Sequence, residues 1–299
     1  MTLNLPRLAY EAKGDDTRLF AKIGERVRIA VKAHQEKRGF IKRLLSHKSS
    51  GPLTLLNMAL DGTPYLRMHR CTFLVGMVGL NELIQYHTGE EMHASVDAMK
   101  FGLKIIAHMK LLTDQYSRKH DMRFVLEQTP AESTAYRFAK LDLKYFPKES
   151  STVVKGEQTA GEVYYTNSTL FDVGAPMNPV ERVKFEGRFH PLIEAGALTH
   201  VWLGESKPPA ESLANFVIKT FKQTKNDQIA FSPEFTSCRV CGRLSRGLHD
   251  ACAHCGSLDV DGITRITGYF TKISSWNKGK LGELKDRYRN NGQFAGRKA

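Results

Sequence analysis

Residues 238–256 read CRVCGRLSRGLHDACAHCG, a stretch with two Cys-X-X-Cys-Gly knuckles separated by ten residues. Four of the chain's five cysteines lie in this window, which indicates a metal site rather than the disulfide framework of a small secreted domain. Two residues between the cysteines of each knuckle let one tight turn direct both sulfurs at one ion. The expected ligands are Cys238, Cys241, Cys252 and Cys255.

Four thiolates predict a structural Zn²⁺ ion, because a complete tetrahedral shell leaves no coordination position for a substrate. The glycine after each second cysteine permits a positive φ at the end of the knuckle. His249 and His254 lie inside the window, and we expect them at the surface because four sulfurs already complete the shell. An iron site of the rubredoxin type and a redox-active dithiol pair are the alternatives. A zinc ribbon by itself does not specify a function.

Upstream of the knuckles, strand-like and helical patterns alternate, which indicates a parallel α/β fold. The strand-like segments are residues 122–126, 162–167, 197–203 and 228–231, and the helical ones are residues 131–143, 179–185 and 210–224. The composition changes near Ser232-Pro233. We therefore expect three segments: an α/β part over residues 1–232, a zinc ribbon over 233–260, and a loop with a basic tail over 261–299.

The N-terminal third is predicted to be mostly helical. Residues 2–5 are strand-like, and Pro6 ends that pattern. Apolar residues recur at helical spacing from Leu19 to Leu45, after the N-capping residues at 15–17, and Gly51-Pro52 stops the helix. Two further helices are predicted over residues 73–86 and 95–117.

Composition and charge limit the class of protein. The chain has 299 residues, of which 41% are hydrophobic and 25% charged, so disorder, collagen and coiled coil are excluded as its main class. No apolar run reaches the roughly 18–20 residues that span a bilayer, and residues 1–10 lack the apolar core of a signal peptide, so we expect a soluble, cytoplasmic protein.

The net charge of +13 lies entirely at the two ends of the chain. Residues 1–50 hold 12 basic and 5 acidic side chains, residues 261–299 hold 9 and 3, and the middle holds 23 of each. A basic end can bind nucleic acid, an acidic partner or a phosphorylated ligand, or it can be a solvated helix face.

The segment after the knuckles contains Arg265-Ile-Thr-Gly268-Tyr269, followed by a basic helical stretch. Together with the cysteine knuckles, this order resembles the C-terminal end of the anaerobic (class III) ribonucleoside-triphosphate reductases. The commoner form of the loop has Val-Cys where this chain has Ile266-Thr267. Five further segments look like that family in the same order: TLNLPRLAY (2–10), VGLNE (78–82), TPAES (129–133), YYTNS (164–168) and FHPLIEAGA (189–197).

The resemblance implies the C-terminal half of a glycyl-radical α/β barrel, followed by a Cys₄ zinc ribbon and a radical loop. It implies a glycyl radical at Gly268, installed by a separate radical-SAM activase that carries an iron–sulfur cluster. The radical then passes to a cysteine, whose thiyl form abstracts the ribose 3′-hydrogen of a ribonucleoside triphosphate. The family is dimeric and oxygen-sensitive, and its reductant is formate or a thiol-redox protein.

In the family, the thiyl cysteine lies just upstream of the segment that matches residues 2–9. Because this sequence starts at Met1, we expect a complementary N-terminal part to carry that cysteine. The fifth cysteine, Cys71, is predicted to be a buried free thiol at the edge of an apolar helix.

Two other functions remain open. One is an inactive reductase fragment. The other is a zinc-ribbon protein that binds nucleic acid through basic residues of the tail: Lys272, Lys278, Lys280, Lys285, Arg287 and Arg289.

Thr129-Pro-Ala-Glu132 matches a capping box, with Thr129 at the N-cap and Glu132 at N3. The same helix start is also a candidate site for a substrate phosphate, formed by Thr129, Ala131 and Ser133, because free N–H groups and the helix dipole favour anions. Asn4 is a further candidate that could face the substrate or the reductant; the alternative is a strand asparagine that satisfies backbone groups.

Overall fold

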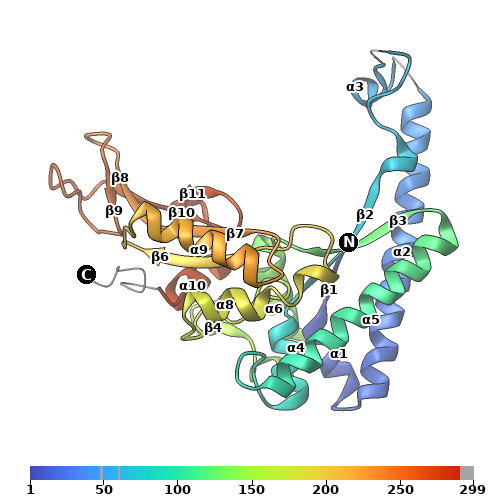
Figure 1. Cartoon of the computed structure of the whole chain (residues 1–299), viewed down its shortest axis with the longest axis horizontal. Coiled ribbons are helices and arrows are strands. Elements are labelled where there is room, and N and C mark those ends of the chain that lie inside the picture. The colour runs from blue at the N-terminus through green and yellow to red at the C-terminus, as the bar shows by residue number, and fades with distance from the viewer. Residues whose placement is uncertain (48–49, 60, 290–299) are drawn as a thin grey trace.

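The protein is described here by a computed structural model that covers residues 1–47, 50–59 and 61–289 (Figure 1). Its first half is built on a three-stranded parallel sheet in the order β1-β2-β3. The strands are β1 (Thr2–Asn4), β2 (Thr72–Val78) and β3 (Arg123–Gln128). Parallel neighbours need long crossovers, and these hold the helices. They are α1 (Leu5–Ala12), α2 (Asp16–Ser46), α3 (Thr54–Asn57) and the 3₁₀ turn η2 (Met68–Arg70) before β2, and α4 (Leu80–Thr88) and α5 (Val96–His120) before β3.

Strand β2 corrects the prediction of one helix over residues 73–86. The run Phe73–Val78 is the middle strand of the sheet and is almost fully buried. Gly79 then takes a left-handed conformation, with φ of 80°, and α4 begins at Leu80. A short apolar run has no clear period, so a buried strand and a buried helix look alike in sequence.

Helix α2 confirms the long helix predicted over residues 19–45. The Asp15 carboxylate caps it by accepting a hydrogen bond from the Arg18 N–H at 3.0 Å. Leu19, Ile23 and Val27 belong to the hydrophobic core, and its last buried residue is His34. The C-terminal part of α2, together with α3, extends away from the body of the molecule (Figure 1).

The second half continues the mixed α/β fold. Helices α6 (Glu132–Tyr145) and α7 (Pro147–Ser150) lead to the antiparallel pair β4 (Lys155–Glu157) and β5 (Glu162–Tyr164). Next come α8 (Pro179–Glu186), the 3₁₀ turn η3 (His190–Leu192) and the parallel pair β6 (Thr199–Gly204) and β7 (Ile229–Pro233), joined through α9 (Ala210–Gln223). A parallel bridge from Glu127 to Ala195 links the end of β3 to the segment before β6.

A four-stranded antiparallel sheet, in the order β11-β10-β8-β9, forms the C-terminal module. Its strands are β8 (Phe235–Cys238), β9 (Leu244–Arg246), β10 (Val260–Arg265) and β11 (Phe270–Lys272). The 3₁₀ turn η4 (Ile273–Ser275) and α10 (Lys278–Asp286) follow. The sheet therefore joins residues from the two segments expected at 233–260 and 261–299. The fold is mixed α/β as predicted, and the half-barrel stays a prediction.

None of the helices in the described part of the chain has the length and apolar character needed to cross a membrane.

Candidate functional site

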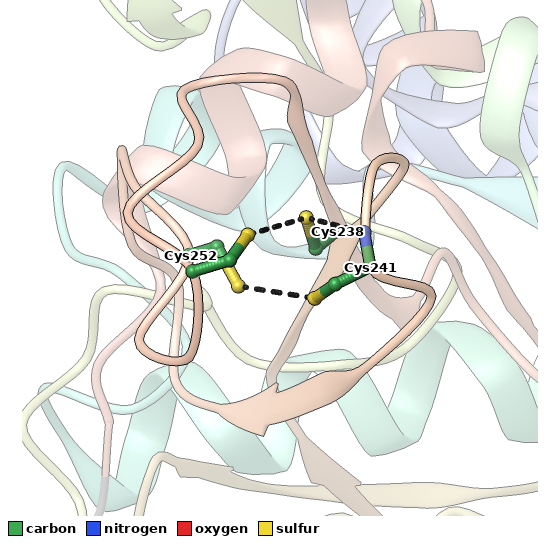
Figure 2. A group of neighbouring side chains, drawn as sticks. Cys238, Cys241 and Cys252 are labelled. Carbon is green, nitrogen blue, oxygen red and sulfur yellow. Dashed lines mark hydrogen bonds between the residues drawn. The ribbon is translucent and has the colours of Figure 1, made fainter.

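The four cysteines of the two knuckles converge at the end of the C-terminal sheet. Cys238 is the last residue of β8 and Cys241 lies in the turn that follows it, whereas Cys252 and Cys255 lie in the loop between β9 and β10. All four sulfur atoms lie within 4.8 Å of one another. Figure 2 shows Cys238 and Cys241 on one loop facing Cys252 on the other.

The geometry of this cluster fits zinc. Tetrahedral Zn–S bonds of about 2.3 Å place two sulfurs roughly 3.8 Å apart. The Sγ atoms are 3.7 Å apart both for Cys238 and Cys255 and for Cys241 and Cys252. Backbone N–H groups turn toward sulfur, from Cys241 to Cys238 and from His254 to Cys252, both at 3.4 Å. The donor set therefore suits a closed, structural metal site.

The backbone conformation also suits metal binding. The two glycines after the knuckles have positive φ, 69° at Gly242 and 72° at Gly256. Hydrogen bonds from the backbone N–H groups of Cys255 and His254 lower the pKa of the Cys252 thiol. For the Cys255 thiol, the hydrogen bond from the Ser257 backbone is outweighed by burial and by its three cysteine neighbours, so its pKa is raised instead. His249 and His254 are exposed, as predicted.

The loop with Gly268 joins β10 to β11 and forms one wall of a cavity of about 260 Å³. The loop is a tight hairpin turn, in which the Ile266 N–H donates to the Tyr269 carbonyl at 3.0 Å. The other walls come from the end of β3 and from two distant segments. The cavity is lined by Glu127, Gln128, Thr129, Pro130, Asn167, Leu170, Gly196, Leu198, His200, Thr267 and Gly268.

Neither backbone conformation nor space requires a glycine at position 268. Its φ lies outside the left-handed range, and a Cβ added there would have no neighbouring atom within 4 Å. Gly282 shows the opposite case, since its added Cβ would lie 2.3 Å from the Glu162 carbonyl oxygen. Gly24 and Gly39 have the same freedom, and what sets Gly268 apart from them is its place in the cavity wall.

His200 supplies a neutral hydrogen-bonding group to the cavity. Its ring stacks on Trp202, with centroids 4.8 Å apart. Burial, and then the positive charge of Arg287, lower the His200 pKa to about 3, so the imidazole is uncharged at neutral pH. Thr267 adds a buried hydroxyl that has no hydrogen-bond partner among the described residues.

Of the four predicted substrate residues, the structure brings Thr129 to the cavity beside Gly268. Ala131 is buried next to it, and its N–H donates to the Asn167 side-chain oxygen at 3.1 Å. Ser133 is exposed and is not part of the cavity lining. Asn4 lies elsewhere, in a cavity of about 500 Å³ bounded by α1, α2 and α6. It caps α1 by accepting from the Arg7 N–H and donates to Asp142 at 2.8 Å.

The predicted capping box at Thr129 is wrong. Helix α6 begins at Glu132 with Ala131 at the N-cap, and no side chain of that cap makes the capping hydrogen bond. The Thr129 hydroxyl donates instead to Glu127, at 3.1 Å. The Ala131 N–H donates to the side-chain oxygen of Asn167, which is distant in sequence. The spacing of residues around Thr129 therefore could not predict this hydrogen bond.

Sequence reasoning did not single out Asn167 or His200. Asn167 lies in the quoted segment 164–168, so that segment was the available signal. His200 follows the quoted segment 189–197 and had no such signal.

Four of the six basic tail residues named above pair with carboxylates of the protein. Lys280 and Arg287 are buried against Glu283, at 2.6 and 2.9 Å. Lys285 pairs with Glu162 at 2.5 Å and Arg289 with Glu234 at 2.9 Å. Within the described part of the tail, these pairings do not support the nucleic-acid alternative, because the charges of the four residues are already neutralised.

Comparison with known proteins places this arrangement in a family. The family model of anaerobic ribonucleoside-triphosphate reductase matches residues 1–289. The chain belongs to that family. It is 27% identical to the reductases of Salmonella typhimurium and Escherichia coli over 98% of its own length, and 24% identical to that of Enterobacteria phage T4 over 73%.

These reductases are longer than the matched region: the chain spans 43% of the two bacterial relatives and 34% of the phage protein. Solved structures share the fold. An anaerobic ribonucleotide reductase covers 97% of this chain with a TM-score of 0.79 and 22% identity. The Thermotoga maritima reductase, solved in complex with dATP and CTP, covers 94% with a TM-score of 0.74 and 22% identity. The chain covers 44% of each.

Proposed function

We propose that this chain is the radical-bearing C-terminal portion of an oxygen-sensitive anaerobic reductase that converts ribonucleoside triphosphates to deoxyribonucleoside triphosphates. The observation that carries the proposal is Gly268, at the wall of a cavity that also presents Gln128, Asn167 and His200, in a position where the fold does not require glycine. Family membership over residues 1–289 supports the same assignment.

Glycine has a chemical advantage in this role. Without a Cβ, its Cα can become planar, and the unpaired electron is shared with the flanking amide nitrogen and carbonyl. A cysteine S–H then gives its hydrogen atom to the Gly268 Cα, which restores glycine and leaves a thiyl radical. That thiyl takes the 3′-hydrogen of the ribose. A radical-SAM activase with an iron–sulfur cluster would first remove the Gly268 hydrogen.

The zinc ribbon has a positioning role in this proposal. Cys238, Cys241, Cys252 and Cys255 would hold the ion, whose closed shell ties the two loops together. Strand β8 ends at Cys238 and pairs with β10, which leads directly to the Gly268 loop. A metal ion that holds the knuckles in place would therefore also hold strand β10, which forms one side of the hairpin that carries Gly268.

The thiyl cysteine would come from a complementary N-terminal part. Cys71 is half-exposed at the end of η2, its thiol donates to the Arg67 carbonyl at 3.5 Å, and it is absent from the cavity lining. It is partly buried, packs against the hydrophobic core and precedes strand β2 instead of lying in an apolar helix, which corrects its predicted setting. The remaining partners of the proposal are the activase, a second copy of the enzyme, and formate or a thiol-redox protein as reductant.

Electron paramagnetic resonance tests the radical assignment. After anaerobic incubation with a radical-SAM activase, the wild-type chain should give a doublet from the single Cα hydrogen of Gly268. Gly268→Ala should fold normally, because its Cβ has open space, and should give no doublet. Brief exposure to air should cleave the activated wild-type chain at residue 268.

Gly39→Ala is the matched control, since Gly39 also has an ordinary φ and its added Cβ would meet nothing closer than 3.9 Å. That variant should keep the doublet. A wild-type chain with no doublet, or a doublet that survives in Gly268→Ala, would contradict the assignment.

A further inference from the structure

The main chain of the Gly268 loop is held by two arginines from different elements. Arg265, the last residue of β10, donates to the carbonyl of Gly268 itself. Arg287, which follows α10, donates from Nη2 to the Ile266 carbonyl at 3.3 Å. Arg265 is local to the hairpin, whereas Arg287 connects the loop to another part of the molecule.

The buried Arg287 side chain contacts two tryptophan rings and one carboxylate. Its guanidinium carbon lies 4.0 Å from the ring centroid of Trp202 and 5.3 Å from that of Trp276, which is cation–π geometry. Nη2 also donates to Glu283 at 2.9 Å. The side chain is 1% exposed, so solvent screens these contacts little.

Glu283 extends this network to another lining residue of the cavity. Its second oxygen accepts from Lys280 at 2.6 Å and from the Asn167 amide at 3.2 Å. Asn167 lines the cavity and holds the Ala131 N–H at the start of α6. One buried chain of contacts therefore joins Ile266, Arg287, Glu283 and Asn167.

Helix α10, which carries Lys280 and Glu283, has little freedom to shift. Added Cβ atoms at Gly279 and Gly282 would lie 2.6 and 2.3 Å from the carbonyl oxygens of Val163 and Glu162 in β5. The two glycines therefore let the helix approach that strand closely. This close packing holds Glu283, the carboxylate that pairs with Arg287, in place.

We infer that Arg287 is a positioning residue that holds the Gly268 loop at a fixed place in the cavity, through the Ile266 carbonyl. This inference rests on the proposed function of Gly268 for its catalytic meaning. Both hydrogen bonds come from Nη2, at the far end of a planar group that lies over Trp202. A lysine side chain is one bond shorter and is not planar, so its ammonium cannot occupy the Nη2 position and stack on Trp202 at the same time. The network thereby sets the distance between the loop and the wall that Asn167 forms.

Hydrogen exchange of the full chain tests the contact without any radical. In Arg287→Lys, the amides of residues 266–270 should exchange about tenfold faster than in the wild type, because one buried charge-assisted hydrogen bond is lost. Residues 72–78 of the parallel sheet should be unchanged. Lys285→Gln is the control, since Lys285 lies on the same helix but is exposed and pairs with Glu162. Equal loop exchange in Arg287→Lys and wild type would overturn the inference.

Should Arg287→Lys fail to fold, Glu283→Gln answers the same question. It keeps the arginine and removes its ionic anchor, so loop exchange should again rise, and unchanged loop exchange would overturn the inference.

Activation then tests the positioning role itself. The spin per chain after anaerobic activation should be about threefold or more lower in Arg287→Lys, because hydrogen-atom transfer depends steeply on placement. Lys285→Gln should match the wild type. An Arg287→Lys spin signal equal to that of the wild type would overturn the positioning role. If the wild type itself shows no signal, the proposed function of Gly268 fails, and loop exchange still decides the Arg287 contact.

Discussion

At the scale of single residues, Glu82 is a buried carboxyl group outside the cavity. It lies in the first turn of α4, is fully buried, and accepts from the Thr166 N–H at 3.1 Å and from the Thr166 hydroxyl. Its second oxygen has no hydrogen-bond partner within the described residues. Burial raises the Glu82 pKa from 4.5 to about 7, although the charge of Lys155 opposes the shift.

This raised pKa predicts how stability depends on pH. The folded state holds a proton on Glu82 that the unfolded chain has lost, so the stabilisation is full below pH 4.5 and disappears as pH rises through about 7. Glu82→Gln should remove this loss and flatten the free energy of unfolding between pH 5 and 8 by roughly 1–3 kcal/mol. Urea unfolding at both pH values measures it.

Glu90→Gln, at an exposed position just beyond α4, is the control and should keep the wild-type pH dependence. An unaltered pH dependence in Glu82→Gln would show that the carboxyl is not the group responsible.

At the scale of elements, the four-cysteine cluster and the Gly268 loop share one sheet. Residues 260–263 of β10 pair with residues 235–238 of β8, and residues 263–265 pair with β11 on the other edge. The pairing continues from Cys238, a proposed ligand, to the hairpin that carries Gly268. Loss of the metal should therefore loosen the Gly268 loop, although none of the proposed metal ligands lies in that loop.

Cys252→Ser tests this coupling. Structural zinc sites contribute on the order of 10 kcal/mol or more to folding, so the variant should lose its zinc and expose the β8–β10 amides to exchange. The loop at 266–270 should become more exchangeable too, while the parallel sheet β1-β2-β3 stays protected. Metal analysis and hydrogen exchange are the measurements.

Cys71→Ser is the matched control, because Cys71 lies outside the cluster, and this variant should retain the metal. A zinc-free Cys252→Ser chain whose loop exchanges like wild type would separate the ribbon from the positioning of Gly268.

At the scale of the whole molecule, the chain corresponds to 43% of the length of its bacterial relatives. The described cavity beside Gly268 has polar walls from Gln128, Asn167 and His200 but no cysteine in its lining. Ribose chemistry by the proposed route needs a thiol there. The complete site is therefore proposed to form when the complementary part joins this one.

Reconstitution tests that proposal. The 299-residue chain with activase, reductant and ribonucleoside triphosphate should form no deoxynucleotide under argon, and addition of the complementary N-terminal part should start the reaction. Cys71→Ser should be as active as wild type in the reconstituted mixture. Deoxynucleotide formation by this chain alone, measured by chromatography, would refute the need for a partner.

Local patterns allowed much of the fold to be predicted. The cap at Asp15 and the periodic apolar face identified α2, because both depend on residues a few positions apart. The cysteine knuckles are local in the same way, since a turn of four residues brings Cys238 and Cys241 together. The apolar run at residues 73–78 was assigned wrongly because burial on both faces removes the period that separates strand from helix.

Local sequence patterns were sufficient to predict the cysteine cluster and the mixed α/β class, and to single out Gly268 as the candidate radical residue. The tertiary structure decided which residues surround Gly268, because the cavity walls come from segments near 127–130, 167–170, 196–200 and 267–268. It also decided that Lys280 and Arg287 of the basic tail are buried and paired with Glu283 instead of exposed to solvent. The physical reason is that a helix cap or a cysteine knuckle is formed by residues a few positions apart in the sequence. The partners of a buried charge and the walls of a cavity come instead from segments that only the fold brings together.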